Sequence, residues 1–443
     1  MKNLIHPVKK DYSPEGVKFK KMNKVIRKEL SCNSKFFNGV HIDFLPNFEK
    51  DDIQIVKKFV FSNSNKSNTG SRENVEKILK RYFSNGDFYF FSSARGALSA
   101  FLKFYLAQNF RKKVLTQGYS CLVVANSIKF AGGIPVFVDI EENSANISNE
   151  DLKKNIDKDT GVLIIQNTFG FPADYKNILQ TAKENNLFVI ENLAHSFGAK
   201  YDGKYLGNFG DVALLSFGRN KVISSLIGGA LVINNKRLSE QFKKFYETLP
   251  EPSKSWTRKQ LIHGIISWQA KKYYTSIGKS LMFLLKHLKL SSLEIEPIEK
   301  RGLITKQYIS KMPDVFFEIL ENQLNKLEKF NEHRKHLANI YKKEGVFHFG
   351  NVSPESEPIY LRYQMFSLKP QKIIEKFKKE HIYIGNWYKS VLAPVQKRLD
   401  RFGYYYGKCP NAEKLALSSY NLPTNINTTE EDARLIAKIL KSN

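Results

Sequence analysis

The stretch from Leu214 to Gly229, LLSFGRNKVISSLIGG, combines residue types that could do covalent chemistry. An apolar run ends at Ser216, a single lysine follows at Lys221, and the stretch closes on two glycines. A lysine ammonium loses its proton readily when it is desolvated or lies near other cations, and the free amine can form a Schiff base. We expect Arg219, two residues earlier, to lower the pKa of Lys221 further. The stretch therefore predicts an enzyme with a reactive lysine.

The elements that must position this lysine alternate between strand and helix from Ser71 onward. Short β-rich runs precede it at 88–91, 113–115, 135–139, 162–165 and 187–190, another follows from Ala230, and helix-period segments such as 173–186 lie between strands. Such alternation indicates a mainly parallel sheet that is covered on both faces and binds ligands at the carboxyl ends of its strands.

A small, polar turn, SSARGAL at 92–98, follows the first of these strands where a helix begins. The N-terminus of a helix offers unpaired amides and a positive partial charge, so a phosphate would bind well there. Ser93, Ala94 and Arg95 are the candidates. An ordinary strand-to-helix turn is the alternative.

Two further motifs lie between this turn and the lysine: QGYSC at 117–121 and VIENLAHSFGA at 189–199. The four motifs, in this order, resemble those of the DegT/StrS sugar aminotransferases, which are fold-type-I enzymes dependent on pyridoxal 5'-phosphate (PLP). The resemblance implies a large α/β domain with a mainly parallel seven-stranded sheet and a smaller C-terminal α/β domain. It also implies that Lys221 holds PLP covalently, while Ser93, Ala94, Arg95 and Ser216 bind its phosphate.

The sequence departs from the family pattern around the cofactor ring. Asn192 stands where the family has the Asp that keeps the pyridine nitrogen protonated, and a neutral amide makes the ring a weaker electron sink. His195 is expected near the phenolic oxygen of PLP. The usual stacking aromatic falls on Cys121, so either Tyr119 stacks on the ring or the ring has no aromatic cover.

We predict four segments: an N-terminal arm at 1–70, the large PLP-binding domain at 71–249, a basic amphipathic insertion at 250–305 and the small C-terminal domain at 306–443. The sequence has no acidic residue between Glu251 and Glu294, while lysines and arginines alternate there with apolar residues. A basic amphipathic helix can lie on an anionic membrane. The alternative is an insertion that packs on the body of the enzyme.

Composition limits the partners and the compartment. The 443 residues carry a formal net charge of +27, which favours an anionic partner, although solvated lysine-rich faces explain it equally well. Nucleic acid ranks last because no recognition motif accompanies the charge. Three scattered cysteines indicate neither disulfides nor a zinc site, and no metal site is expected. No signal peptide and no spanning run is evident, so we expect a cytoplasmic protein, with peripheral membrane contact as a further option.

The function expected from the resemblance is transfer of an amino group from an amino acid, with glutamate the first candidate, to a keto-sugar on a nucleotide or lipid carrier, by a homodimer. Asn192 keeps two alternatives open. One is a PLP-dependent dehydration of a sugar, and the other is a catalytically silent protein of the same fold that binds a partner or a membrane.

Overall fold

The computed structural model describes residues 39–43, 45–62, 70–287, 292–303, 306–394 and 397–442. Of the predicted N-terminal arm at 1–70, residues 1–38, 44 and 63–69 lie outside the described residues. The predicted domain boundaries stay predictions.

The large sheet has the seven strands expected from the resemblance. In spatial order they are β2 (Asp87–Phe91), β11 (Gly229–Ile233), β10 (Val212–Ser216), β7 (Phe188–Asn192), β6 (Thr160–Gln166), β3 (Lys113–Gln117) and β5 (Ile134–Val138). β10, β7, β6, β3 and β5 run parallel to one another, and β11 is antiparallel to both β2 and β10. The prediction of a mainly parallel sheet is confirmed.

Both faces of this sheet are buried, because successive side chains of a strand point to opposite faces. Phe88 and Phe90 belong to one hydrophobic core, while Tyr89 and Phe91 belong to another. The helix that precedes β2 is α3 (Ser71–Leu79). The helices that follow strands of the sheet are α4 (Ala94–Ala107), α5 (Leu122–Phe130), α6 (Asn149–Lys154), α7 (Tyr175–Glu184) and α8 (Lys236–Glu247). α4, α5 and α8 contribute to the second core and α3 and α7 to the first, so they cover opposite faces.

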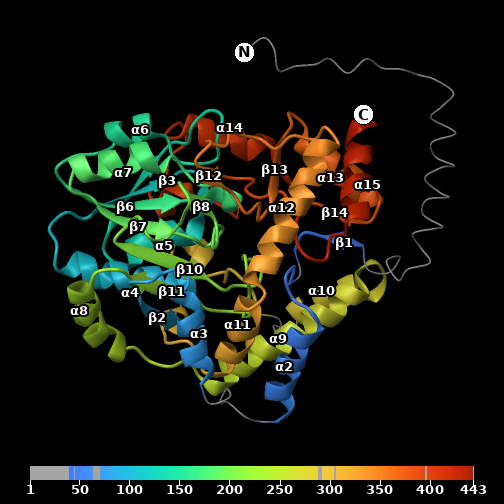
Figure 1. Cartoon of the computed structure of the whole chain (residues 1–443), viewed down its shortest axis with the longest axis horizontal. Coiled ribbons are helices and arrows are strands. Elements are labelled where there is room, and N and C mark those ends of the chain that lie inside the picture. Colours follow the sequence, from blue (N-terminus) through green and yellow to red (C-terminus); the bar gives the residue numbers. More distant parts are fainter. Residues whose placement is uncertain are drawn as a thin grey trace.

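The C-terminal part lies beside the sheet, where α12, α13 and α15 are grouped to its right in Figure 1. Its elements are α11 (Val315–Leu324), α12 (Leu327–Lys343), β13 (Tyr363–Phe366), α13 (Pro370–Lys379), η6 (Leu399–Phe402), α14 (Pro410–Ser418), β16 (Ser419–Leu422) and α15 (Glu430–Lys441). β13 and β16 pair antiparallel. Thr429 and Asp432 form a capping box at the start of α15.

Short strands tie these parts together. β1 (Val40–His41) pairs with β14 (Ile382–Tyr383), β4 (Ser120–Cys121) pairs with β15 (Leu392–Ala393), and β8 (Lys200–Tyr201) lies between β9 (Lys204–Tyr205) and β12 (Ser356–Glu357). A 3-10 turn, η2 (Thr168–Gly170), follows β6.

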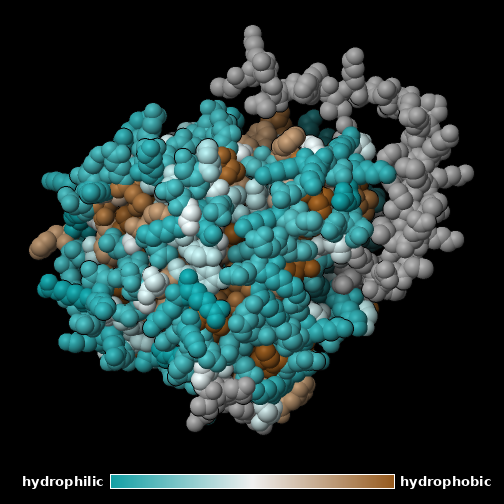
Figure 2. Space-filling model, viewed as in Figure 1, coloured by the Kyte–Doolittle hydropathy of each residue, from teal (hydrophilic) through white to brown (hydrophobic). Residues whose placement is uncertain are grey.

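The predicted basic insertion forms helices at the lower right of Figure 1, beside α2 (Lys50–Phe61). Its elements are α9 (Lys254–Lys272), the π-helical turn η3 (Tyr274–Gly278), α10 (Lys279–His287) and the 3-10 turn η4 (Glu299–Arg301), and η5 (Lys306–Tyr308) follows. One face of α9 is buried and includes Gln260, Leu261 and His263. The insertion therefore packs on the body of the enzyme through α9. The face drawn in Figure 2 is mainly hydrophilic, with apolar residues in small separate patches.

A buried carboxylate fixes the carboxyl end of β7. Glu191 is fully buried and accepts hydrogen bonds from the backbone N–H groups of Gly207, Phe209 and Gly210 at 2.6–2.7 Å and from the hydroxyl of Tyr175 at 2.9 Å. Because these bonds tie the 207–210 turn to β7, they hold the next residue of the strand, Asn192, in place.

We predict that Glu191→Gln lowers the free energy of unfolding by about 3 kcal/mol, because the amide places N–H groups against donors that need an acceptor. Chemical denaturation measures this value. Glu142→Gln, at an exposed turn, is the matched control and should change stability little. Equal stability of the two variants would contradict this role of Glu191.

Candidate active site at the carboxyl edge of the sheet

A cavity of about 620 Å³ opens at the carboxyl ends of β2, β7 and β10. Its walls come from the turns that follow these strands, from the start of α5, from residues 293–295 of the insertion and from the 386–394 segment. Among the residues predicted for the site, those that line the cavity are Ser93, Ala94, Arg95, Asn192, His195, Ser216 and Lys221. The edge of the sheet that the strand pattern indicated is therefore the edge that carries the cavity.

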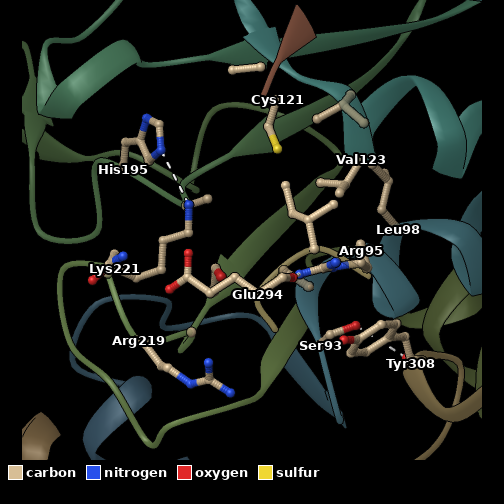
Figure 3. A pocket seen from close by; sticks show the side chains of 18 of the residues that line it. Ser93, Arg95, Leu98, Cys121, Val123, His195, Arg219, Lys221, Glu294 and Tyr308 are labelled. Carbon is tan, nitrogen blue, oxygen red and sulfur yellow. Dashed lines mark hydrogen bonds between the residues drawn. The ribbon is translucent and has the colours of Figure 1, made fainter. Parts of the chain in front are cut away.

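Lys221 and His195 point toward each other across the cavity (Figure 3), with Lys221 Nζ 3.3 Å from His195 Nε2. Burial lowers the pKa of Lys221, and the charges of Arg362 and Arg95 lower it further, while Cys121 and Glu294 oppose this effect. Burial, and then Lys221 and Arg362, lower the pKa of His195 well below its usual value. The pair thus favours an uncharged amine, which is the nucleophilic form of lysine.

Arg219, which was expected to lower the pKa of Lys221, has partners of its own in the insertion, and its effect on Lys221 stays a prediction. The guanidinium of Arg219 turns to the insertion, where it donates to the carbonyl of Ser292 at 2.8 Å and to Gln260 Oε1 at 3.1 Å. Arg219 therefore holds the wall of the cavity, while Arg362 and Arg95 lower the pKa of Lys221.

A polar clamp that the sequence did not reveal holds the backbone of Lys221. Asn47 Nδ2 donates to the carbonyls of Lys221 and Val222, and Arg334 donates to the Val222 carbonyl and to Asn47 Oδ1. Arg334 is fully buried, and burial lowers its pKa to about 9. Asn47 lies in the predicted arm and Arg334 in a helix of ordinary charge pattern, so no local signal marks either residue.

Asn192 lies at the end of β7 and is almost fully buried. Its Oδ1 accepts a hydrogen bond from the backbone N–H of Ala194 at 3.2 Å. With its oxygen used in this way, the amide presents its N–H groups to a ligand in the cavity. A donor of this kind suits an unprotonated pyridine nitrogen.

The predicted phosphate turn caps α4. Ser93 Oγ accepts from the backbone N–H of Gly96 at 3.0 Å, so the helix begins at Ala94 with its amides directed toward the cavity edge. A Cβ on Gly229 would lie 2.4 Å from the backbone nitrogen of Ala94, so only glycine allows β11 to approach this closely. Ser216 ends the neighbouring strand. The turn, the glycine and the reachable amine of Lys221 fit PLP: the amides at the start of α4 would hold its phosphate, and Lys221 would bind its aldehyde.

Arg95 has a partner within the insertion. Its Nη1 lies 2.6 Å from both carboxylate oxygens of Glu299, its Nη2 donates to the carbonyl of Glu294, and its guanidinium lies 4.5 Å from the ring centroid of Tyr308. The structure therefore brings Arg95 to the cavity while engaging it with a carboxylate. Phosphate binding by Arg95 stays a prediction.

Tyr119 does not reach the cavity. Its side chain is fully buried, and its hydroxyl accepts from the backbone N–H of Tyr388 at 2.8 Å and donates to the Tyr388 carbonyl at 3.2 Å. Cys121, two residues on, lines the cavity instead. Trp387 also lines it, with its ring centroid 5.7 Å from Lys221 Nζ. Of the two readings left open, stacking by Tyr119 is therefore wrong, because Tyr119 lies in the bend between β3 and β4 with its ring in a hydrophobic core.

The described residues contain neither a metal-binding cluster nor a membrane-spanning helix. No group of three or more His, Cys, Asp or Glu side chains in these ranges is placed to hold a metal ion. Likewise, none of the helices described is both long enough and apolar enough to cross a bilayer.

Comparison with known proteins agrees with this geometry. The family model of the DegT/DnrJ/EryC1/StrS aminotransferases matches residues 46–441. GDP-perosamine synthase of Escherichia coli O157:H7 is 26% identical over 314 residues, which cover 70% of this chain and 73% of that protein. UDP-4-amino-4,6-dideoxy-N-acetyl-beta-L-altrosamine transaminase of Helicobacter pylori is 24% identical over 354 residues, which cover 75% and 88%.

Solved structures share the fold. Helicobacter pylori PseC, an aminotransferase involved in the biosynthesis of pseudoaminic acid, superposes with a TM-score of 0.67 at 19% identity, covering 92% of this chain and 98% of that chain. Sugar aminotransferase CalS13 from Micromonospora echinospora gives a TM-score of 0.66 at 15% identity, covering 92% and 99%. The expected fold, enzyme class and cofactor are confirmed. The chain belongs to the DegT/DnrJ/EryC1/StrS aminotransferase family of PLP-dependent enzymes.

Proposed function

We propose that this enzyme transfers an amino group from an amino acid, with glutamate the first candidate, to a keto-sugar on a nucleotide carrier. The observation that carries the proposal is the buried amine of Lys221 in a cavity large enough for a cofactor and a sugar. The names of the relatives, among them the synthase of GDP-perosamine, support a nucleotide-linked sugar. A lipid carrier is the alternative.

Lys221 performs two tasks in this proposal. As a free amine it would hold the aldehyde of the cofactor, and once released it would act as the general acid and base that carries a proton to and from the substrate. PLP, when bound, supplies the electron sink for this transfer. The hydrogen bonds from Asn47 and Arg334 hold the backbone of Lys221 and Val222, so the amine of Lys221 extends into the cavity from a fixed position.

The charges around the cavity support an anionic carrier. Arg95, Arg219, Lys300 and Lys389 line it together with Lys221, while Glu294 is the carboxylate among its described lining residues. Figure 3 shows Glu294 and Arg219 on the same side of the cavity as Lys221. A diphosphate would be attracted to such a cavity, and the carboxylate would accept hydrogen bonds from sugar hydroxyls.

Asn192 favours a second candidate function. With N–H groups toward an unprotonated ring nitrogen, the cofactor withdraws electrons less strongly, and this would suit dehydration of a sugar better than amino transfer. A silent protein of this fold is the third candidate, against which the fit of Lys221 and the phosphate turn argues.

We also propose a homodimer and a peripheral contact with anionic membrane. The contact would form through η3 and α10, where Ile277 of η3 and Phe283 and Leu284 of α10 are 54–68% exposed. Exposed basic residues of α9, among them Lys254 and Lys272, lie on the same insertion. Each such cation contributes about 1 kcal/mol near an anionic surface.

The first experiment traps the cofactor. PLP followed by borohydride should add its mass to the peptide that contains Lys221, and the added mass should be absent in Lys221→Met. Lys183→Met, at an exposed lysine of α7, is the matched control and should retain it. Glutamate should then convert the bound cofactor to its amine form in the wild type, as followed by chromatography. Trapping at Lys221 without this conversion would favour the dehydration reading.

A second experiment tests the ring nitrogen. Asn192→Asp should speed the conversion by glutamate about tenfold, because a charge-assisted bond is about twice as strong as a neutral one and about 1.4 kcal/mol is a factor of ten. Stopped-flow absorbance measures the rate, with Asn186→Asp at an exposed turn as the control. A slower Asn192→Asp enzyme would show that our account of the ring nitrogen is mistaken.

A third experiment tests the membrane contact. Vesicles that contain anionic lipid should carry the protein upward in a density gradient at low salt and release it at high salt, because screening weakens surface charge. Phe283→Ser should float several-fold less, while Phe347→Ser, at an exposed phenylalanine outside the insertion, should float like the wild type. Absence of flotation at low salt would leave α10 as a packing element.

A further inference from the structure

The imidazole of His195 has two polar neighbours on the same nitrogen. His195 Nε2 lies 3.3 Å from Lys221 Nζ and also 3.3 Å from Tyr388 Oη. Within the described part of the chain, these are the two side-chain groups that the structure places within hydrogen-bond distance of Nε2. The tyrosine comes from the C-terminal part of the chain and the lysine from the turn after β10.

The other nitrogen of the ring settles where the proton lies. The backbone N–H of Phe169 donates to His195 Nδ1 at 3.4 Å, so Nδ1 is an acceptor. Because burial keeps the imidazole neutral, its single proton must then lie on Nε2. The ring of Phe169 stacks on His195 with centroids 5.6 Å apart and planes 12° apart, which fixes the orientation of the imidazole.

One N–H therefore faces two candidate acceptors, and the state of Lys221 decides between them. A free amine has a lone pair and can accept the bond from Nε2–H. An ammonium has no lone pair and cannot accept it. When Lys221 is protonated, the phenol oxygen of Tyr388 is the remaining acceptor for Nε2–H.

Tyr388 is held firmly enough for this task. It is 4% exposed, and its backbone N–H and carbonyl are both bonded to the hydroxyl of Tyr119. Burial raises the pKa of Tyr388 well above its usual value, so it stays a neutral phenol that can accept a hydrogen bond. The buried position of Tyr119 thus has a consequence for the site, because it anchors Tyr388.

We propose that Tyr388 is a positioning residue that accepts the Nε2–H bond of His195 whenever Lys221 is protonated, and so holds the imidazole in one orientation through both states of the lysine. The inference rests on the proposed function only in taking Lys221 as the reacting amine. Tyr388 acts through His195 and needs no contact with substrate.

Loss of the phenol oxygen of Tyr388 should lower the pKa of Lys221. In Tyr388→Phe the Nε2–H group would face the ammonium of Lys221 without an acceptor, so the protonated form is destabilised and the pKa of Lys221 falls. Loss of one neutral hydrogen bond corresponds to about half to one pKa unit. The other charged or titratable groups that act on Lys221 are Cys121 at the start of α5, Glu294 of the insertion, Arg362 before β13 and Arg95 in α4, and the substitution leaves all of them in place.

The experiment measures the pKa of Lys221 directly in the full-length chain, freed of cofactor by treatment with hydroxylamine followed by dialysis. Competitive acetylation with acetic anhydride across pH 6–11, followed by mass spectrometry of the Lys221 peptide, gives the midpoint of the reactive amine. We expect the midpoint of Tyr388→Phe to lie about half to one unit below that of the wild type. Tyr388→Leu, which also lacks an acceptor, should shift it in the same direction.

Two controls separate positioning from packing. Tyr404→Phe removes another buried hydroxyl, which donates to Glu413 at 2.6 Å outside the cavity, and should leave the midpoint unchanged. In a His195→Phe background, which has no Nε2–H, Tyr388→Phe should produce no further shift. An unchanged or higher midpoint in Tyr388→Phe, or a shift that persists without His195, overturns the proposal.

This measurement is independent of the proposed function. Acetylation needs neither cofactor nor sugar, so the midpoints are obtained even from a chain that fails to convert PLP with glutamate. A normal shift in such a chain would support the role of Tyr388 while arguing against amino transfer.

Discussion

A lysine amine buried against a neutral imidazole is the interaction on which this site depends. Removal from water disfavours the ammonium of Lys221, and an imidazole with Nδ1 already bonded to Phe169 offers it an N–H rather than a negative charge. The amine must nevertheless stay where the cofactor can meet it. The backbone carbonyls of Lys221 and Val222 are therefore held from outside the sheet, by Asn47 and by the buried Arg334.

The same constraint explains the position of the insertion. Two arginines at the edge of the cavity hold it: Arg219 binds the carbonyl of Ser292, and Arg95 binds the carboxylate of Glu299. Residues 293–295 thereby become one wall of the cavity. Because the guanidinium of Arg95 is already paired with the carboxylate of Glu299, it is less available to a phosphate. Phosphate binding at the start of α4 and the position of the insertion are therefore coupled through Arg95.

Sequence reasoning found what is encoded locally. The strand pattern predicted a mainly parallel sheet with ligands at its carboxyl edge. The resemblance to the aminotransferase family implied the seven strands and the roles of Asn192, His195 and Lys221 at that edge. What it missed depends on tertiary contacts. Arg334 and Asn47 are 287 residues apart and Arg95 and Glu299 are 204 apart, so no spacing in the chain reveals either pair. Tyr119 was misassigned because its place in the core depends on its hydrogen bond with Tyr388, which is 269 residues away in the chain.

A crystal structure of the chain with PLP tests the central claim most directly. The account predicts continuous density from Lys221 Nζ to the cofactor, with the phosphate at the amides of Ala94 and Arg95 and the ring nitrogen beside the side-chain N–H of Asn192. Cofactor bound outside the cavity, or bound within it without a link to Lys221, would contradict the account.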